Sequence, residues 1–140
     1  MSLGLRVMGA GIGAVAALGV VFAVPSPARA DNAVAPSVLT LTVGDGESLD
    51  AATDQRTVLL ICSPLALGTH PQTARACEEL WAAGGDFGEL KGEPMRFCPF
   101  IYKPITVAAE GIWNGISVSY HRTFPNRCVE QNTNRYVFAF

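Results

Sequence analysis

Four cysteines, at positions 62, 77, 98 and 128, constrain the fold of this 140-residue chain more than any other feature. An even number of cysteines in an exported chain is typical of disulfides, and four cysteines allow three pairings that spacing alone does not distinguish. A metal site is the alternative, but the chain has no Cys-x-x-Cys and neither histidine lies at ligand spacing from a cysteine. We therefore predict two disulfides, no metal site and no cofactor.

The first 30 residues predict that the chain is exported. Arg6 gives the start a positive charge, residues 7–24 are apolar or glycine, and Ala28 and Ala30 are the small residues of an A-x-A site. Together these features are typical of a secretory signal peptide, which we assign to residues 1–30. A membrane anchor is the alternative, because about 18 apolar residues lie near the lower limit for spanning a bilayer. Cleavage would leave a secreted, extracellular protein that is not held in a membrane.

Residues 31–140 are long enough for one small domain. Removing Arg6 and Arg29 from the ten basic residues leaves eight against twelve acidic residues, so the net charge of this part is −4. An acidic chain without basic runs does not neutralise phosphates, which argues against nucleic acid as a partner.

The apolar pattern of this domain predicts an α+β fold. Short apolar or alternating runs typical of strands occur at residues 37–43, 56–62, 105–109, 116–124 and 136–140. Asn114-Gly115 is typical of a hairpin turn between two of them. A helix is expected from Pro71, capped by Thr69 or His70, to the glycine pair at 84–85, with a further short helical turn at 86–90. We expect an antiparallel sheet of about five strands, covered on one face by one longer and one short helix.

The predicted elements also favour one disulfide pairing. Cys77 lies on the apolar face of the predicted helix, and Cys62 lies at the end of the second predicted strand. Packing of the helix on the sheet brings these two cysteines together. We therefore predict the pairs Cys62–Cys77 and Cys98–Cys128.

Three large apolar residues, Phe100, Ile101 and Tyr102, follow Cys98-Pro99 and precede Pro104. Such residues usually fold into the core. Here the prolines and the cysteine instead favour a stiff, extended loop, and loops lie on the surface. A serine protease binds its substrate as an extended strand, with the residue before the scissile bond in the main pocket. Phe100 suits a chymotrypsin-like or subtilisin-like pocket.

Short motifs in a fixed order carry a resemblance to a known family. They include LTLTVG at 39–44, GTHP at 68–71, GGD at 84–86, CP at 98–99, VSY at 118–120 and VFAF at 137–140. Residues 31–140 resemble the Streptomyces subtilisin inhibitor family over nearly their whole length. The resemblance implies a reversible, substrate-like inhibitor of secreted serine proteases, the same two disulfides, and a homodimer formed through the sheet.

The resemblance also implies roles for single residues. The reactive bond is Phe100–Ile101, with Phe97, Cys98 and Pro99 in upstream subsites of the protease and Tyr102 downstream. Phe97 would be a second apolar anchor, so subtilisin-like enzymes are the first expected targets and chymotrypsin-like enzymes the second.

Asn126 lies two residues before Cys128, so the predicted disulfide brings its amide beneath the loop, where it can support the loop backbone. The alternative is a solvated turn residue. Two residues depart from the family pattern: Lys103 stands where an acidic residue is common and Pro125 where serine is usual. These changes bear on the downstream preference and on the position of the Asn126 amide.

Two other classes of function have less support in the sequence. An enzyme would need a nucleophile motif, and no Gly-x-Ser-x-Gly is present to act with His70 or His121. We therefore predict no catalytic residues. A secreted, non-catalytic binding module would use Trp113, Tyr120 and Tyr136 as a stacking surface, although aromatic residues along strands usually belong to the core.

Overall fold

The computed structural model describes residues 9, 11, 13, 14, 16, 19–26, 33–93 and 96–140. The chain forms two compact units, Met1–Asp31 and Asn32–Phe140. The described residues of the first unit have no regular secondary structure. The predicted signal cleavage site, at residues 28–30, lies outside the described residues. No helix in the described part of the chain is long and apolar enough to cross a membrane.

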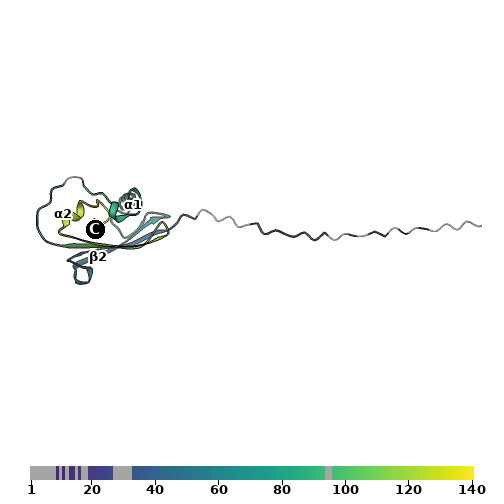
Figure 1. Cartoon of the computed structure of the whole chain (residues 1–140), viewed down its shortest axis with the longest axis horizontal. Helices are drawn as coiled ribbons and strands as arrows, with labels where there is room; N and C mark the ends of the chain where they lie inside the picture. Colours follow the sequence, from purple (N-terminus) through teal and green to yellow (C-terminus); the bar gives the residue numbers. More distant parts are fainter. Residues whose placement is uncertain are drawn as a thin grey trace, which may run out of the picture. The chain divides into compact units, whose positions relative to one another are not determined.

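The second unit is the predicted α+β domain. Its described residues form one antiparallel sheet of five strands in the order β3-β2-β1-β4-β5. The strands are β1 (Ser37–Asp45), β2 (Thr53–Ser63), β3 (Leu67–Gly68), β4 (Ile105–Trp113) and β5 (Ile116–Phe124). The helices are α1 (Thr73–Ala82) and the shorter α2 (Arg127–Gln131), with single 3-10 turns η1 (Leu49–Ala51) and η2 (Phe87–Glu89). Figure 1 shows both α-helices on the same side of the sheet, with the C-terminus between them.

Strand β1 is the central strand of the sheet, and its alternating sequence decides which of its side chains face the core. Leu39, Leu41 and Val43 point to one face and are fully buried, while Thr40 points to the other face and is exposed. The buried side chains pack with Leu80 of α1 and with residues of β2 and β4 in a single core. Burial of one face of the strand therefore fixes its register, because a shift by one residue would turn these side chains to solvent.

The predicted hairpin joins β4 to β5. Asn114 and Gly115 both have positive φ, 48° and 80°, which matches the turn type that suits the twist of two antiparallel strands. Ile105 at the start of β4 pairs with Phe124 at the end of β5. The loop that precedes β4 therefore begins beside the segment that follows β5, and this pairing brings residues 97–104 close to Asn126 and α2.

One predicted strand, residues 136–140, is wrong. Val137 and Phe138 are buried as their apolar character predicts, but the segment does not join the sheet. The Glu79 carboxylate of α1 accepts hydrogen bonds from the backbone N–H groups of residues 135, 136 and 137 at 2.6, 2.7 and 3.0 Å. Because a side chain takes these donors, no strand ladder is needed, and the fifth strand is the short β3 instead.

Helix α1 begins at Thr73, two residues after the predicted start at Pro71. His70 lies just before this start, and its Nδ1 accepts the N–H of Gln72 at 2.9 Å. Its Nε2 therefore carries the proton and donates to the Val137 carbonyl at 3.0 Å. Burial lowers the pKa of His70, which stays neutral as a link between α1 and the C-terminal segment.

Both predicted disulfides are present. Cys62 of β2 bonds Cys77 of α1, with a Cα–Cα distance of 5.3 Å, and this bridge fastens the helix to the sheet. Cys98 of the loop bonds Cys128 of α2 with a Cα–Cα distance of 5.6 Å. The short helical turn predicted at 86–90 is the 3-10 turn η2. Helix α2 lies in a segment whose polar sequence did not predict a helix.

Candidate functional site

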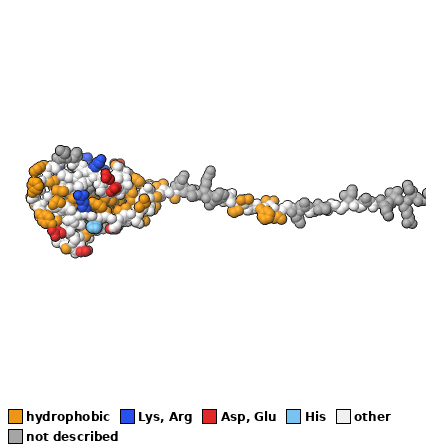
Figure 2. All heavy atoms as spheres, viewed as in Figure 1, with side chains coloured by type: hydrophobic (Ala, Val, Ile, Leu, Met, Phe, Trp, Pro, Cys, Tyr) orange, Lys and Arg blue, Asp and Glu red, His pale blue; other side chains and the backbone are white. Residues whose placement is uncertain are grey.

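The loop of residues 97–104 presents its large apolar side chains to solvent. The relative exposure is 102% for Phe100, 86% for Phe97, 68% for Tyr102 and 60% for Ile101. Figure 2 shows hydrophobic side chains gathered at the edge of the folded domain where Figure 1 shows this loop. Core packing of Phe100 and Ile101, the ordinary expectation for such residues, is therefore excluded. An exposed cluster of this kind is a surface for another protein.

The loop has no regular secondary structure, yet the domain holds it at several points. The first is the Cys98–Cys128 disulfide, which joins the loop to α2. Helix α2 is only five residues long, and Asn126 caps it by accepting the N–H of Val129 on Oδ1 at 3.0 Å. The cap orients the Asn126 side chain, so its Nδ2 points at the loop.

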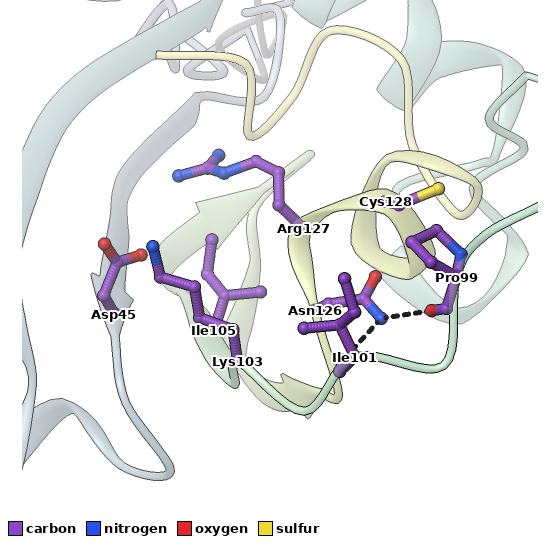
Figure 3. Close-up of a pocket in the computed structure, with 8 residues that line it drawn as sticks. All are labelled: Asp45, Pro99, Ile101, Lys103, Ile105, Asn126, Arg127 and Cys128. Carbon is purple, nitrogen blue, oxygen red and sulfur yellow. Dashed lines mark hydrogen bonds between the residues drawn. The ribbon is translucent and has the colours of Figure 1, made fainter.

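Asn126 holds the loop on both sides of residue 100. Its Nδ2 donates to the carbonyl oxygen of Ile101 at 2.9 Å and to that of Pro99 at 3.2 Å. Figure 3 shows the Asn126 amide between these two residues, at the wall of a hollow beneath the loop. The hollow is lined by Asp45, Pro99, Ile101, Lys103, Ile105, Asn126, Arg127 and Cys128. Next to residue 100, the loop is therefore supported by one buried amide.

The downstream half of the loop is fixed by its backbone. The N–H of Lys103 donates to the Pro125 carbonyl, and the N–H of Gly46 donates to the Pro104 carbonyl, both at 2.9 Å. Proline at position 125, where the family usually has serine, does not displace the Asn126 amide, which makes both of its hydrogen bonds to the loop. The carbonyl of Pro125 itself accepts a hydrogen bond from the loop. The side chain of Lys103 is exposed and points toward Asp45 in Figure 3.

Glu47 is a contact residue that the sequence analysis missed. The Tyr102 hydroxyl donates a hydrogen bond to its carboxylate, and this bond raises the pKa of Tyr102. Glu47 lies in the connection between β1 and β2, 55 residues before Tyr102. No local sequence pattern predicts the contact between Glu47 and Tyr102 over this separation.

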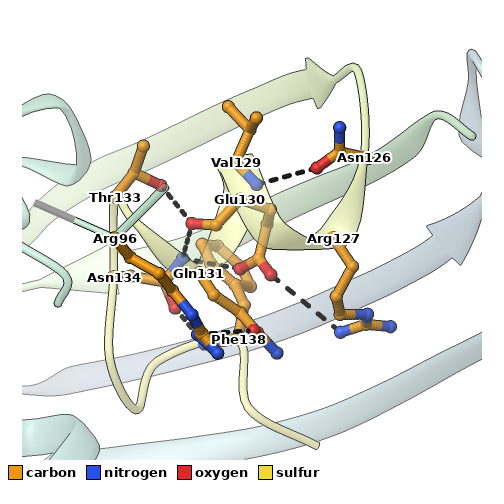
Figure 4. Close-up of polar contacts among 9 residues, drawn as sticks. All are labelled: Arg96, Asn126, Arg127, Val129, Glu130, Gln131, Thr133, Asn134 and Phe138. Carbon is orange, nitrogen blue, oxygen red and sulfur yellow. Dashed lines mark hydrogen bonds and ion pairs between the residues drawn. The ribbon is translucent and has the colours of Figure 1, made fainter. Parts of the chain in front are cut away.

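A buried carboxyl group lies on α2, beside the residues that hold the loop. Glu130 is 1% exposed and accepts a hydrogen bond from Asn134 at 2.6 Å on Oε1. Its Oε2 has no hydrogen-bond partner in the part of the chain that the structure describes, and lies 4.0 Å from the Arg127 guanidinium. Figure 4 shows the Glu130 carboxyl group between Arg127 and Asn134. Burial raises the pKa of Glu130, with Asn134 and Arg127 acting in the opposite direction.

We expect the Glu130→Gln variant to be more stable than the wild type at neutral pH and to lose that advantage in acid. The unfolded chain releases this proton near the ordinary pKa of 4.5, below the folded pKa. The folded state therefore loses stability as the pH rises from 4.5 through the folded pKa. Glutamine has the same shape and keeps the acceptor for Asn134. Urea unfolding of both proteins between pH 4 and pH 8 measures the difference, and a difference that does not vary with pH contradicts the expectation.

The residues that an enzyme or a stacking surface would use have other positions. Trp113 is buried against Trp81, with ring centroids 4.5 Å apart, while Tyr120 and Tyr136 pack against the core. Both ring nitrogens of His70 are hydrogen-bonded to the backbone, at Gln72 and Val137. His121 is exposed on β5. Among the described residues, no group of three or more His, Cys, Asp or Glu side chains is arranged to hold a metal ion.

Comparisons with known proteins agree with this geometry. A family model described as subtilisin inhibitor-like matches residues 35–126. A probable subtilase-type protease inhibitor from Streptomyces avermitilis is 46% identical over 113 residues, which cover 81% of this chain and 78% of that protein. A trypsin inhibitor from Streptomyces longisporus is 45% identical over 122 residues, covering 87% and 84% of the two chains.

A solved structure gives the same result. It is the crystal structure of Streptomyces caespitosus sermetstatin in complex with Bacillus licheniformis subtilisin. The match has a TM-score of 0.66 and 37% identity, and covers 75% of this chain and 99% of the other.

Proposed function

This chain belongs to the subtilisin inhibitor-like family of protease inhibitors, and from that premise we propose that it is a reversible, substrate-like inhibitor whose reactive bond is Phe100–Ile101. Phe97, Cys98 and Pro99 lie upstream of this bond and Tyr102 lies downstream. The protease binds these residues as it binds a substrate, through hydrogen bonds to an extended backbone and through side-chain pockets.

One observation supports this bond above all. A single amide, that of Asn126, is hydrogen-bonded to the carbonyls of Pro99 and Ile101, one on each side of residue 100. After cleavage between Phe100 and Ile101, the same side chain would be in contact with both new chain ends. The geometry is what a supporting residue requires, and we assign that role to Asn126.

The mechanism follows from the attachments of the two halves. The protease serine attacks the Phe100 carbonyl carbon, the bond to the Ile101 nitrogen breaks, and an acyl-enzyme forms with a free amine on Ile101. The downstream half remains bound through its contacts with Asn126 and Pro125. Its amine stays beside the acyl carbon at a high effective concentration, so resealing of the bond competes with hydrolysis.

Little conformational entropy is lost when the protease binds, because the loop is already fixed. The Cys98–Cys128 bridge and the hydrogen bonds of Asn126 order the segment before any contact with the enzyme. Preorganisation of this kind raises affinity without a larger interface, and protease–inhibitor complexes of standard size are among the tightest known.

The exposed aromatic rings indicate the class of target. Phe100 suits a large apolar pocket, and Phe97 offers a second apolar anchor three residues upstream. We propose subtilisin-like enzymes as the first targets and chymotrypsin-like enzymes as the second. Lys103 brings a positive charge to the downstream side, where a protease with an acidic surface would be favoured.

Titration against subtilisin tests the proposal. We expect stoichiometric loss of protease activity, and a cut between residues 100 and 101 when the complex is analysed by mass spectrometry. Phe100→Asp should weaken inhibition by roughly a hundredfold or more, as for a central anchor residue. Ile116→Ala removes another exposed apolar side chain, at the start of β5 and at the far end of the hairpin from the loop, and should change nothing. Unchanged protease activity in the wild-type titration would leave a non-catalytic binding module as the function.

The sequence of residues 1–30 leads us to propose export, with residues 31–140 as the mature inhibitor. Its charged start, apolar middle and A-x-A end are those of a signal peptide. N-terminal sequencing of protein recovered from the culture medium tests this assignment. A mature chain that still begins at Met1 contradicts it.

We also propose that the inhibitor is a homodimer formed through the sheet. The face opposite the helices exposes Val38, Leu59 and Ile112 on three adjacent strands, each 36–41% accessible. These are half-exposed apolar side chains in the middle of a sheet, where a second sheet could cover them. Light scattering should give twice the mass of the mature chain. The Ile112→Lys variant should give the mass of one mature chain, because it places a charge on this apolar face.

A further inference from the structure

Helix α2 carries a second asparagine in contact with the loop. Asn132 follows the last residue of α2, and its Nδ2 donates to the carbonyl oxygen of Arg96 at 2.9 Å. The same nitrogen lies 3.2 Å from the Cys98 sulfur. Asn126 and Asn132 thus occupy the two ends of one short helix, about 9 Å apart along its axis. The disulfide to Cys98 lies between them at Cys128.

The Asn132 amide is held in one orientation. Its backbone N–H bonds the carbonyls of Cys128 and Val129, which fixes the residue on the helix. Its Oδ1 is buried and has no hydrogen-bond partner among the described residues. A flipped amide would place Oδ1 against the Arg96 carbonyl oxygen, so two acceptors would face each other. The Asn132 Nδ2 group therefore stays bonded to the Arg96 carbonyl, while Oδ1 is buried without a hydrogen bond to a described residue. Burial of an unpaired acceptor costs free energy, which an asparagine exposed to water would not lose.

We propose that Asn132 is a positioning residue for the upstream half of the reactive loop, an inference that rests on the proposed function. The Cys98–Cys128 bridge and the contact of Asn126 with the Pro99 carbonyl hold this half close to the reactive bond. The Asn132 contact with the Arg96 carbonyl adds an attachment two residues upstream of the bridge. Attachment on both sides of Cys98 defines the direction in which Pro99 and Phe100 leave the helix, and hence where the acyl carbon of Phe100 lies.

The two asparagines then have different tasks. Asn126 contacts the chain on both sides of the reactive bond, whereas Asn132 contacts only the upstream side. Arg96 strengthens this attachment, because its guanidinium donates to the Gln131 side chain at 3.1 Å, as Figure 4 shows. Loss of Asn132 should leave the first encounter with the protease unchanged, because the exposed rings of Phe97 and Phe100 remain. It should instead misalign the acyl group against the Ile101 amine and favour hydrolysis.

Asn132→Asp is the variant that tests this role, because aspartate has the same size and no N–H to donate. We expect net cleavage at residues 100–101 to rise about threefold to tenfold, the worth of one hydrogen bond. The inhibition constant for subtilisin should weaken by a similar factor, while the association rate constant stays that of the wild type. Asn114→Asp makes the same substitution at an exposed residue of the β4–β5 turn, away from the loop, so it should behave as the wild type.

Asn132→Ser removes the reach of the amide without adding a charge and should reproduce the effect. The inference is overturned if both variants match Asn114→Asp in cleavage rate and inhibition constant. It is also overturned if they lose inhibition only in parallel with their melting temperature, because Asn132 would then support the fold as a whole. A wild type that inhibits subtilisin without a cut at 100–101 overturns the proposed reactive bond instead, so the two failures are distinguishable.

Discussion

Replacing both Cys98 and Cys128 with serine is expected to turn this inhibitor into a substrate of subtilisin. The bridge closes a segment of 30 residues, and the chain-entropy model gives such a closure about 3–4 kcal/mol. That energy corresponds to several hundredfold in the equilibrium between folded and unfolded chains, and the same bridge keeps the upstream cut end attached to α2. Without the bridge, the described part of the upstream half is held by hydrogen bonds to the side chains of Asn126, Gln131 and Asn132, which are worth roughly 1 kcal/mol each.

The matched control is the other disulfide. Replacing Cys62 and Cys77 with serine removes a bridge of 15 residues that fastens α1 to the sheet and does not contact the loop. This variant loses about 3 kcal/mol of stability on the same model, yet should remain a stoichiometric inhibitor below its melting temperature. Residual subtilisin activity and the mass of the inhibitor, followed over time, separate the two variants. If the protein without Cys98 and Cys128 still inhibits and stays uncut, the tether does not explain inhibition.

What the sequence predicted well was local. The alternation of β1 and the Asn114-Gly115 turn specify their structures within a few residues, so β1 and the β4–β5 hairpin appear where expected. The exposed loop was predictable for the same reason, because Pro99, Pro104 and Cys98 all act on their immediate neighbours.

What the sequence did not predict depends on contacts between distant residues. The apolar segment at 136–140 reads as a strand, and only the position of Glu79 shows that its backbone donors are already taken. Helix α2 has a polar sequence and depends on its cap and on the disulfide. Asn126 was within reach of sequence reasoning because it is two residues from Cys128. Asn132 and Glu47 were not, since each contacts the loop over more than 30 residues.

Replacing Phe100 with lysine is expected to move the preference of this inhibitor to trypsin. Phe100 is fully exposed, so the change does not disturb the core. A trypsin-like pocket ends in a buried carboxylate that phenylalanine leaves unpaired and lysine satisfies. Sites built around such a group discriminate by on the order of 10⁴-fold.

The same change should weaken binding to subtilisin and chymotrypsin by roughly 30-fold or more, because a central aromatic anchor is lost and an ammonium group must enter an apolar pocket. Phe97→Lys is the matched control: it puts the same charge in the same loop, on a side chain that is also exposed. It should weaken binding to subtilisin without creating affinity for trypsin, since position 97 lies too far upstream to enter the main pocket. Inhibition constants for the three proteases test both variants. If Phe100→Lys and Phe97→Lys gain equally against trypsin, the gain is general charge attraction, and residue 100 does not occupy the pocket.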